Sequence, residues 1–342
     1  MTQTAQYLEA VNYPIKFLQL SNSSIKLYQS CHRKFELRKL CGLSQQTREL
    51  APEVGKAMHN MYQTYLVTGD REAALFELLT KYPVDLNNNP TNPRSVEACY
   101  ATAMEIMSHA HLANYEIAQI DCKDGVRRPA IEVPFRIVLK DFSLDGQWHY
   151  EPEPDNPLKV KRVPNIPVVY VGFIDAILFD VTTMNEFAVV DLKTFRDDSL
   201  DLTAKFAYDE QCLPYGMVLE HVLGGNFEGF VVKYLAAHID IRTPRVGLYS
   251  FEKNREDIQD WARGFLATLH SIRWEFSQQW FHRNRAGESC RAWRKDCEFF
   301  QICNSRSLKQ VMGMLLGPDA PDTKPAPFPE PWIELELSLE AG

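Results

Sequence analysis

The sequence lacks any apolar run of the roughly 18–20 residues that a helix needs to cross a bilayer. Its first residues, MTQTAQYLEAVNYP, also lack the basic start and apolar stretch of a signal peptide. Both absences predict an intracellular protein, placed in the cytoplasm and without membrane contact. A glycine-rich Walker loop and internal repeats are missing too, so nothing in the sequence suggests an ATP-driven motor.

An excess of positive charge is also missing. The chain has 37 Lys and Arg against 45 Asp and Glu, and its net charge of −8 is unusual for a nucleic-acid binder. The charge is unevenly distributed, however. Residues 318–342 hold six acids and one base, whereas residues 273–309 hold eight bases and four acids. Because phosphate contacts depend on the local field, a nucleic-acid partner is not excluded.

Disulfide bonds are not expected, although the chain has eight cysteines, because an intracellular compartment keeps thiols reduced. The cysteines therefore raise the expectation of a bound metal or cluster. Apolar residues make up 45% of the chain and charged residues 24%, which is typical of a globular protein. A length of 342 residues suffices for one elaborate domain or two modest ones.

The spacing of apolar residues predicts helices first and then strands alternating with helices. Helical spacing covers residues 25–40, 52–67, 70–82, 93–120, 202–223 and 254–283, with a kink at Pro214. Strands are predicted over residues 130–140, 227–238 and 246–251, and as a pair over 168–195 that turns at 182–185. Residues 145–167 are predicted to form a loop or a long hairpin arm. This order predicts a mixed α/β fold with a helical N-terminal lobe.

The strand pair over residues 168–195 carries two acids and a lysine among apolar residues. Asp191 and Lys193 are two residues apart, so their side chains leave the strand on one face, and the hairpin brings Asp175 close to them. Burying these charges costs free energy unless they are paired. A divalent metal between the acids would offset that cost. The alternative is an ordinary Asp–Lys ion pair near the end of a sheet.

Four other polar residues are ambiguous when each is taken alone. His59 lies on the second predicted helix, where a single histidine is more often structural. Gln211 and Tyr215 are four residues apart and share a helix face. Glu132 alternates with apolar residues in a strand and is as easily structural as functional.

Together and in this order, the motifs resemble the RecB-type nucleases of the PD-(D/E)XK superfamily. The resemblance is to its iron–sulfur group, which includes the CRISPR-adaptation exonuclease and the AddB nuclease domain. The matching segments are SIKLYQSCHRKF at 24–35, GKAMH at 55–59, GFID at 172–175, DLKT at 191–194, QCLPY at 211–215, and Cys290, Cys297 and Cys303. The DLKT strand followed by Q-x-x-x-Y is the most specific part.

The resemblance implies a restriction-endonuclease-like fold, in which a mixed central sheet is flanked by helices and a cysteine-cluster segment follows. It also implies DNA phosphodiester hydrolysis with Mg²⁺ or Mn²⁺. Its implied roles are metal binding by His59, Asp175 and Asp191, water orientation by Lys193, positioning by Gln211 and Tyr215, and a second ion or metal-bound water at Glu132.

The resemblance further implies that Cys31, Cys290, Cys297 and Cys303 hold a 4Fe-4S cluster. Four cysteines can also bind Zn²⁺, which stays an alternative. The family commonly has a gap of two residues between the first cysteines of the C-terminal trio, whereas six residues separate Cys290 from Cys297. Cys41 is therefore an alternative ligand.

The predicted function is an exonuclease that acts on single-stranded DNA ends in recombination, repair or CRISPR-type processing. Alternatives are a non-catalytic DNA- or partner-binding module on the same scaffold, and a structure-specific endonuclease. The expected organisation is a helical lobe at 1–125, a nuclease core at 126–285, a cysteine-rich segment at 286–317 and a disordered acidic tail at 318–342. The tail is expected to dock a protein partner, to mimic nucleic acid or to be inert.

Overall fold

A computed structural model describes most of the chain. The described residues are 13, 15–43, 49–87, 92–109, 114–182, 187–195, 201–223, 227–282, 290, 297, 299–300, 303 and 328–337. The α-helices are α1 (Asn22–Ser30), α2 (His32–Phe35), α3 (Leu50–Thr68), α4 (Arg71–Lys81), α5 (Val96–Ser108), α6 (Leu202–Ala207), α7 (Leu213–Leu223) and α8 (Arg255–Gln278). None of the described helices is long and apolar enough to span a membrane.

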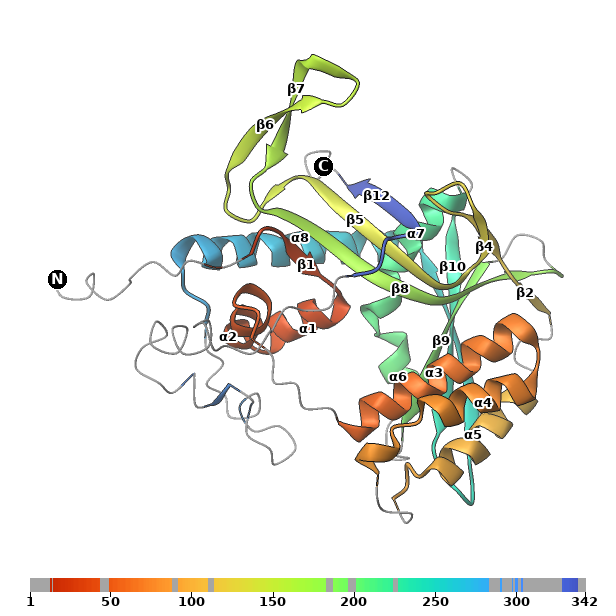
Figure 1. The fold of residues 1–342 in the computed structure, drawn as a ribbon. Coiled ribbons are helices and arrows are strands. Elements are labelled where there is room, and N and C mark those ends of the chain that lie inside the picture. Colours follow the sequence, from red (N-terminus) through yellow and green to blue (C-terminus); the bar gives the residue numbers. More distant parts are fainter. Residues whose placement is uncertain are drawn as a thin grey trace.

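A curled mixed sheet forms the centre of the molecule, and its main path runs β11-β10-β9-β8-β5-β12 (Figure 1). The strands are β1 (Leu18–Leu20), β2 (Tyr115–Ile117), β3 (Gln119–Asp121), β4 (Arg127–Pro129), β5 (Ile131–Ser143), β6 (Trp148–Glu153), β7 (Asn156–Pro164), β8 (Pro167–Asp180), β9 (Phe187–Phe195), β10 (Gly229–His238), β11 (Arg245–Asn254) and β12 (Ile333–Leu337). β1 and β2 also pair with β8, while β9 and β10 run parallel. The predicted mixed α/β fold with a helix-flanked central sheet is confirmed.

Helices cover both faces of this sheet. Met58 and Met61 of α3 belong to one buried cluster with Val190 of β9, whereas Phe265 of α8 belongs to a second cluster with Val189. Consecutive residues of β9 thus enter different cores, as the period of two in a strand requires. α3 and α8 therefore lie on opposite faces of the sheet.

Two predicted helices are wrong in part. The helix expected over 93–120 ends at Ser108, and the alternating sequence from Tyr115 to Asp121 forms β2 and β3 instead. The helix expected over 202–223 is broken, because the Asp209 side chain accepts a hydrogen bond from the Gln211 N–H and starts a short 3-10 turn. Pro214 then lies in the first turn of α7, where a missing N–H costs nothing, so it produces no kink.

The segments at 145–167 and 318–342 also differ from simple loops. Residues Trp148–Pro164 form the hairpin arm β6–β7, which projects away from the sheet (Figure 1). Disorder is wrong for Ile333–Leu337, since this part of the acidic tail is β12, parallel to β5. Its alternation explains the difference, because Ile333 and Leu335 are buried while the glutamates between and after them meet basic side chains. Residues 318–327, 338–342 and the turn at 183–186 lie outside the described residues.

Candidate active site

The hairpin β8–β9 and helix α3 bring three metal-binding side chains together. β8 and β9 are antiparallel, and their register pairs Ala176 with Val190, so Asp175 lies beside Asp191. His59 reaches them from α3, and its Nδ1 is 3.2 Å from Oδ2 of Asp175. One possible ligand atom from each of His59, Asp175 and Asp191 lies within 4.8 Å of the others. The structure thus brings these three predicted ligands together.

Lys193 connects the acids to the Gln211 turn. Its Nζ lies 2.7 Å from Oδ2 of Asp191 and donates a hydrogen bond to Oε1 of Gln211 at 2.9 Å. Gln211 in turn donates through Nε2 to the Tyr215 hydroxyl at 3.4 Å. The structure thus joins Lys193, Gln211 and Tyr215 in one chain of contacts, which holds the ammonium group from both sides.

Asp191 bears the highest cost of burial in the site. Its side chain is 2% exposed, and its Oδ1 has no hydrogen-bond partner among the described residues. Burial, followed by the nearby charge of Asp175, raises the pKa of Asp191 to about 7, although Lys193 opposes the shift. An unpartnered carboxylate oxygen beside a second acid and an imidazole suits a divalent cation, which would stabilise the charged form. The residues present therefore fit a metal ion.

The pKa values of the neighbouring groups follow from their pairing. Burial opposes charge on His59, but its contact with Asp175 outweighs this and raises the histidine pKa. Burial likewise opposes ionisation of Asp175, yet the hydrogen bond and charge of His59 lower its pKa. The pKa of Lys193 is raised by Asp191 despite burial. The site thus has two acids with opposite shifts and a lysine that stays charged.

The sequence matches the profile of the PD-(D/E)XK nuclease superfamily over residues 19–304. The chain belongs to the PD-(D/E)XK nuclease superfamily. Membership implies a metal-dependent nuclease, which agrees with the group of His59, Asp175 and Asp191. No curated protein matches the sequence.

Two solved structures are similar to this PD-(D/E)XK chain at low identity. One is the "Putative exonuclease" from Eubacterium rectale; it is 12% identical, with a TM-score of 0.45, and the alignment covers 86% of this chain and 92% of that one. The other is SSO0001, 13% identical with a TM-score of 0.25, and the alignment covers 77% and 90% of the two chains.

Glu132 lies at the rim of the same site in a strained conformation. Its φ of 50° falls in the left-handed region, which is uncommon for a residue other than glycine. The neighbouring register pairs Ile131 with Ala176 and Val133 with Ile174, so Glu132 lies across from Asp175. Burial, followed by the charge of Asp175, raises the pKa of Glu132. The structure thus places this predicted residue next to the acids.

Gln63 holds Glu132 and was missed in the sequence. Its Nε2 donates a hydrogen bond to Oε1 of Glu132. Gln63 follows His59 by four residues on α3, so both side chains lie on one helix face. That spacing is the signal that identifies it. Gly55 of α3 faces Thr194 of β9. A Cβ at this position would lie 3.6 Å from the Thr194 hydroxyl, which is an ordinary contact, so the approach of α3 to β9 does not require a glycine.

Some of the cysteines form a second candidate site. All eight are free thiols. The Cys297 N–H donates to the Cys290 carbonyl at 2.8 Å, which brings these two residues into one turn. Cys297 and Cys303 pack against a small apolar cluster, whose buried members are Leu37, Cys41, Leu43 and Phe299. The structure therefore brings the C-terminal cysteines to the helical segment that follows Cys31.

A zinc ion and a four-iron cluster require different distances between the cysteine sulfurs. Around one tetrahedral Zn²⁺, with bonds of about 2.3 Å, thiolate sulfurs lie about 3.8 Å apart. Among the described residues, no three of the sulfurs of Cys31, Cys290, Cys297 and Cys303 lie within 4.8 Å of one another. In a four-iron cluster each thiolate binds a different iron, so the sulfurs are farther apart.

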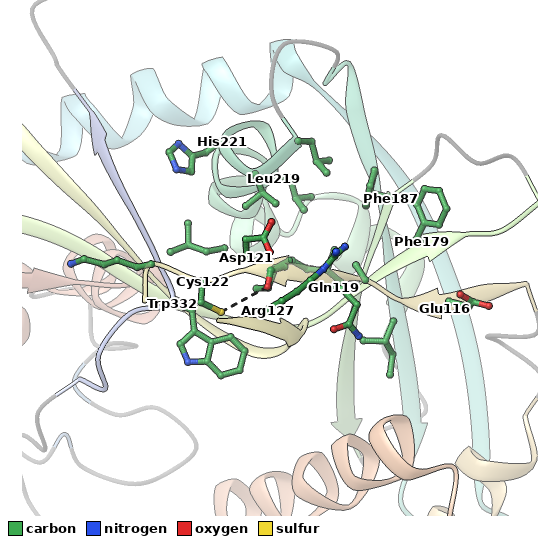
Figure 2. A pocket seen from close by; sticks show the side chains of 18 of the residues that line it. Glu116, Gln119, Asp121, Cys122, Arg127, Phe179, Phe187, Leu219, His221 and Trp332 are labelled. Atoms are coloured by element: carbon green, nitrogen blue, oxygen red, sulfur yellow. Dashed lines mark hydrogen bonds between the residues drawn. The ribbon is translucent and has the colours of Figure 1, made fainter. Parts of the chain in front are cut away.

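A cavity of about 750 Å³ lies apart from both sites (Figure 2). Strands β2 to β4, the end of α7 and the start of β12 line it, with Arg127, His221 and Trp332 among the side chains that face it. None of its lining residues is a predicted metal ligand or a neighbour of Lys193. This cavity is therefore separate from the acids.

Proposed function

We propose that the protein is a Mg²⁺- or Mn²⁺-dependent deoxyribonuclease that degrades single-stranded DNA from its ends. The observation that carries this proposal is the convergence of His59, Asp175 and Asp191, with Lys193 held 2.7 Å from Asp191. Carboxylates suit hard divalent cations, and the imidazole favours Mn²⁺ somewhat.

The proposed mechanism divides the work among the residues of the site. His59, Asp175 and Asp191 would hold the metal ion, which when bound acidifies a water molecule and polarises the scissile phosphate. Lys193 orients the attacking water and stabilises negative charge on the phosphate. Gln211 fixes the lysine through its 2.9 Å hydrogen bond, and Glu132 holds a second ion or a water.

Exposed aromatic residues support single-stranded DNA as the substrate. Trp274 and Trp280, at and just after the end of α8, are 60% and 54% exposed, and the basic stretch 273–309 begins there. Bases of a single strand can stack on such rings, while basic residues contact phosphates. The resemblance to RecB-type exonucleases favours an end-dependent reaction.

We also propose that a 4Fe-4S cluster joins the N-terminal helices to the C-terminal cysteines. Cys297 and Cys303 pack against the apolar cluster that contains Leu37 and Cys41, which supports a cofactor at this place. The resemblance assigns Cys31 as the N-terminal ligand, and Cys41 is an alternative ligand because the spacing of Cys290 departs from the family pattern. The role of this cofactor is structural.

The decisive experiment is cleavage of end-labelled linear single-stranded DNA with Mn²⁺, Mg²⁺ or EDTA. Lys193→Ala and Asp191→Ala are expected to reduce kcat by about 10³-fold or more, since each removes stabilisation of the developing charge. Cleavage of closed circular strands at the same rate would identify an endonuclease. Absence of cleavage by folded, metal-loaded wild type would favour a non-catalytic binding module.

A further inference from the structure

The segment from Phe328 to Leu337 runs to the edge of the active site. β12 pairs with β5 so that Ile333 lies opposite Phe135, and the Trp332 N–H donates to the Pro134 carbonyl at 2.9 Å. Pro134 pairs with Phe173 across β5 and β8. At the start of the segment, the Phe328 ring lies 4.9 Å from the Phe173 ring. Residues more than 150 positions apart thus form one aromatic pair.

This pair lies close to Asp175, on the face of β8 turned away from α8. Phe173 precedes Asp175 by two residues on β8, which is about 7 Å along the strand. Tyr170 packs against Trp261 of α8, and because Phe173 is an odd number of residues away, its side chain leaves the opposite face. Two residues further along the strand, Asp175 meets His59 of α3, whose Nδ1 is 3.2 Å from its Oδ2.

We propose that Phe173 and Phe328 form the platform on which the base next to the scissile phosphate stacks. This inference rests on the proposed nuclease function and extends it to a specific contact with single-stranded substrate. Phe173 and Phe328 are each only half-buried, so ring surface is open to solvent. Stacking on a ring is available to every base, which suits an enzyme without sequence preference.

Ion pairs anchor the segment that carries Phe328. Glu334 lies 3.1 Å from Arg136 and 3.0 Å from Lys123, and Glu336 pairs with Lys140. The Arg128 guanidinium lies 5.3 Å from the centre of the Trp332 ring. The acidic residues of β12 are therefore each paired with a basic side chain, which offsets part of their negative charge where the segment borders the proposed DNA site.

The test compares two labelled strands of equal length, oligothymidine and an abasic strand with the same number of phosphates. Binding is measured by fluorescence anisotropy with Ca²⁺ in place of Mg²⁺. Wild type is expected to bind oligothymidine more tightly. Phe328→Ala is expected to weaken oligothymidine binding by about tenfold and to leave abasic binding unchanged, because only base stacking is lost. Phe328→Trp should restore the preference.

If Phe328→Ala weakens binding of both strands equally, or of neither, the proposal of a stacking platform is wrong. Phe76→Ala, at an exposed ring on α4, is the matched control and should bind both strands like wild type. If Phe328→Ala does not fold by circular dichroism, Phe328→Leu keeps the apolar contact and removes the ring. If wild type cuts DNA but the Phe328 variants still bind oligothymidine more tightly than the abasic strand, the stacking platform is refuted and the proposed nuclease function is not. If wild type binds oligothymidine more tightly than the abasic strand but never cuts DNA, the proposed nuclease function is refuted and the stacking platform is not.

Discussion

At the scale of single residues, Asp191 is the most informative group in the molecule. It is buried, its pKa is raised to about 7, and Oδ1 lacks a hydrogen-bond partner among the described residues. In the metal-free protein the folded state therefore holds a proton on Asp191 at pH values where the unfolded chain has lost it. Such a mismatch makes folding stability depend on pH.

Metal-free protein is expected to lose stability as pH rises from about 4 to about 7. Between the ordinary carboxyl pKa and the raised one, the folded state binds more protons than the unfolded state, so each step up in pH favours unfolding. The loss is at most about 4 kcal/mol for a shift of about three pKa units. Urea unfolding at pH 5 and pH 8 in EDTA measures it. Asp191→Asn should remove most of this pH dependence, and an unchanged slope in that variant would contradict the assignment.

Gln63 makes a second prediction at this scale. Gln63→Ala leaves the strained Glu132 without its hydrogen-bond donor, and kcat is expected to fall by about tenfold with little change in KM. Gln63→Asn is the shorter control, and Gln63→Glu should be worse than Ala because it adds a fourth acid to Glu132, Asp175 and Asp191. Equal kcat in Gln63→Ala and wild type would show that Glu132 needs no support.

The acids, Lys193 and the Gln211 pair were predictable from sequence because each sits in a short motif with fixed spacing. The φ of Glu132 was not, because it is set by how β5 meets Asp175 on β8 and not by neighbours in the chain. The contact of Phe328 with Phe173 was equally invisible, since 155 positions separate them and no local pattern joins them.

At the scale of elements, the break between α6 and α7 positions Gln211. The Asp209 carboxylate accepts from the Gln211 N–H and also pairs with Lys26 of α1 at 3.0 Å. The sequence predicted one helix here because its apolar spacing is continuous, while the competing local hydrogen bond of an aspartate decided otherwise. Disorder was likewise expected at β12, but its apolar and acidic residues alternate, so the apolar ones are buried while Arg136 and Lys140 pair with the glutamates.

Asp209 should therefore matter to both stability and turnover. Asp209→Ala removes the cap and is expected to cost about 1 kcal/mol of unfolding free energy. It should also lower kcat several-fold, since Gln211 no longer holds Lys193. Asp209→Asn keeps the acceptor oxygen and loses only the charge, so thermal melts and single-turnover cleavage should place it near wild type. If Asp209→Ala and Asp209→Asn lower the Tm and the cleavage rate equally, the ion pair with Lys26, and not the cap, is responsible for both effects.

At the scale of the whole molecule, two C-terminal cysteines pack against the N-terminal helical segment. Cys297 and Cys303 pack where Leu37 and Cys41 are buried, so the proposed cofactor would close a loop of more than 250 residues. Closing a loop of this length restricts the unfolded chain and stabilises the fold, and bound metal adds its own binding free energy. Removal of the cofactor is therefore expected to loosen the N-terminal helices from the rest.

Single cysteine variants can identify the ligands and measure this effect. Cys303→Ser should abolish charge-transfer absorption near about 400 nm in anaerobically purified protein and lower the Tm by several degrees, because iron ligation by thiolates is lost. Cys99→Ala, in the buried face of α5, should keep the absorption. Between the N-terminal candidates, Cys31→Ser is expected to lose the absorption and Cys41→Ser to keep it. Burial raises the pKa of the Cys41 thiol to about 12, which disfavours the thiolate that iron requires, so the reverse result would reassign the ligand to Cys41.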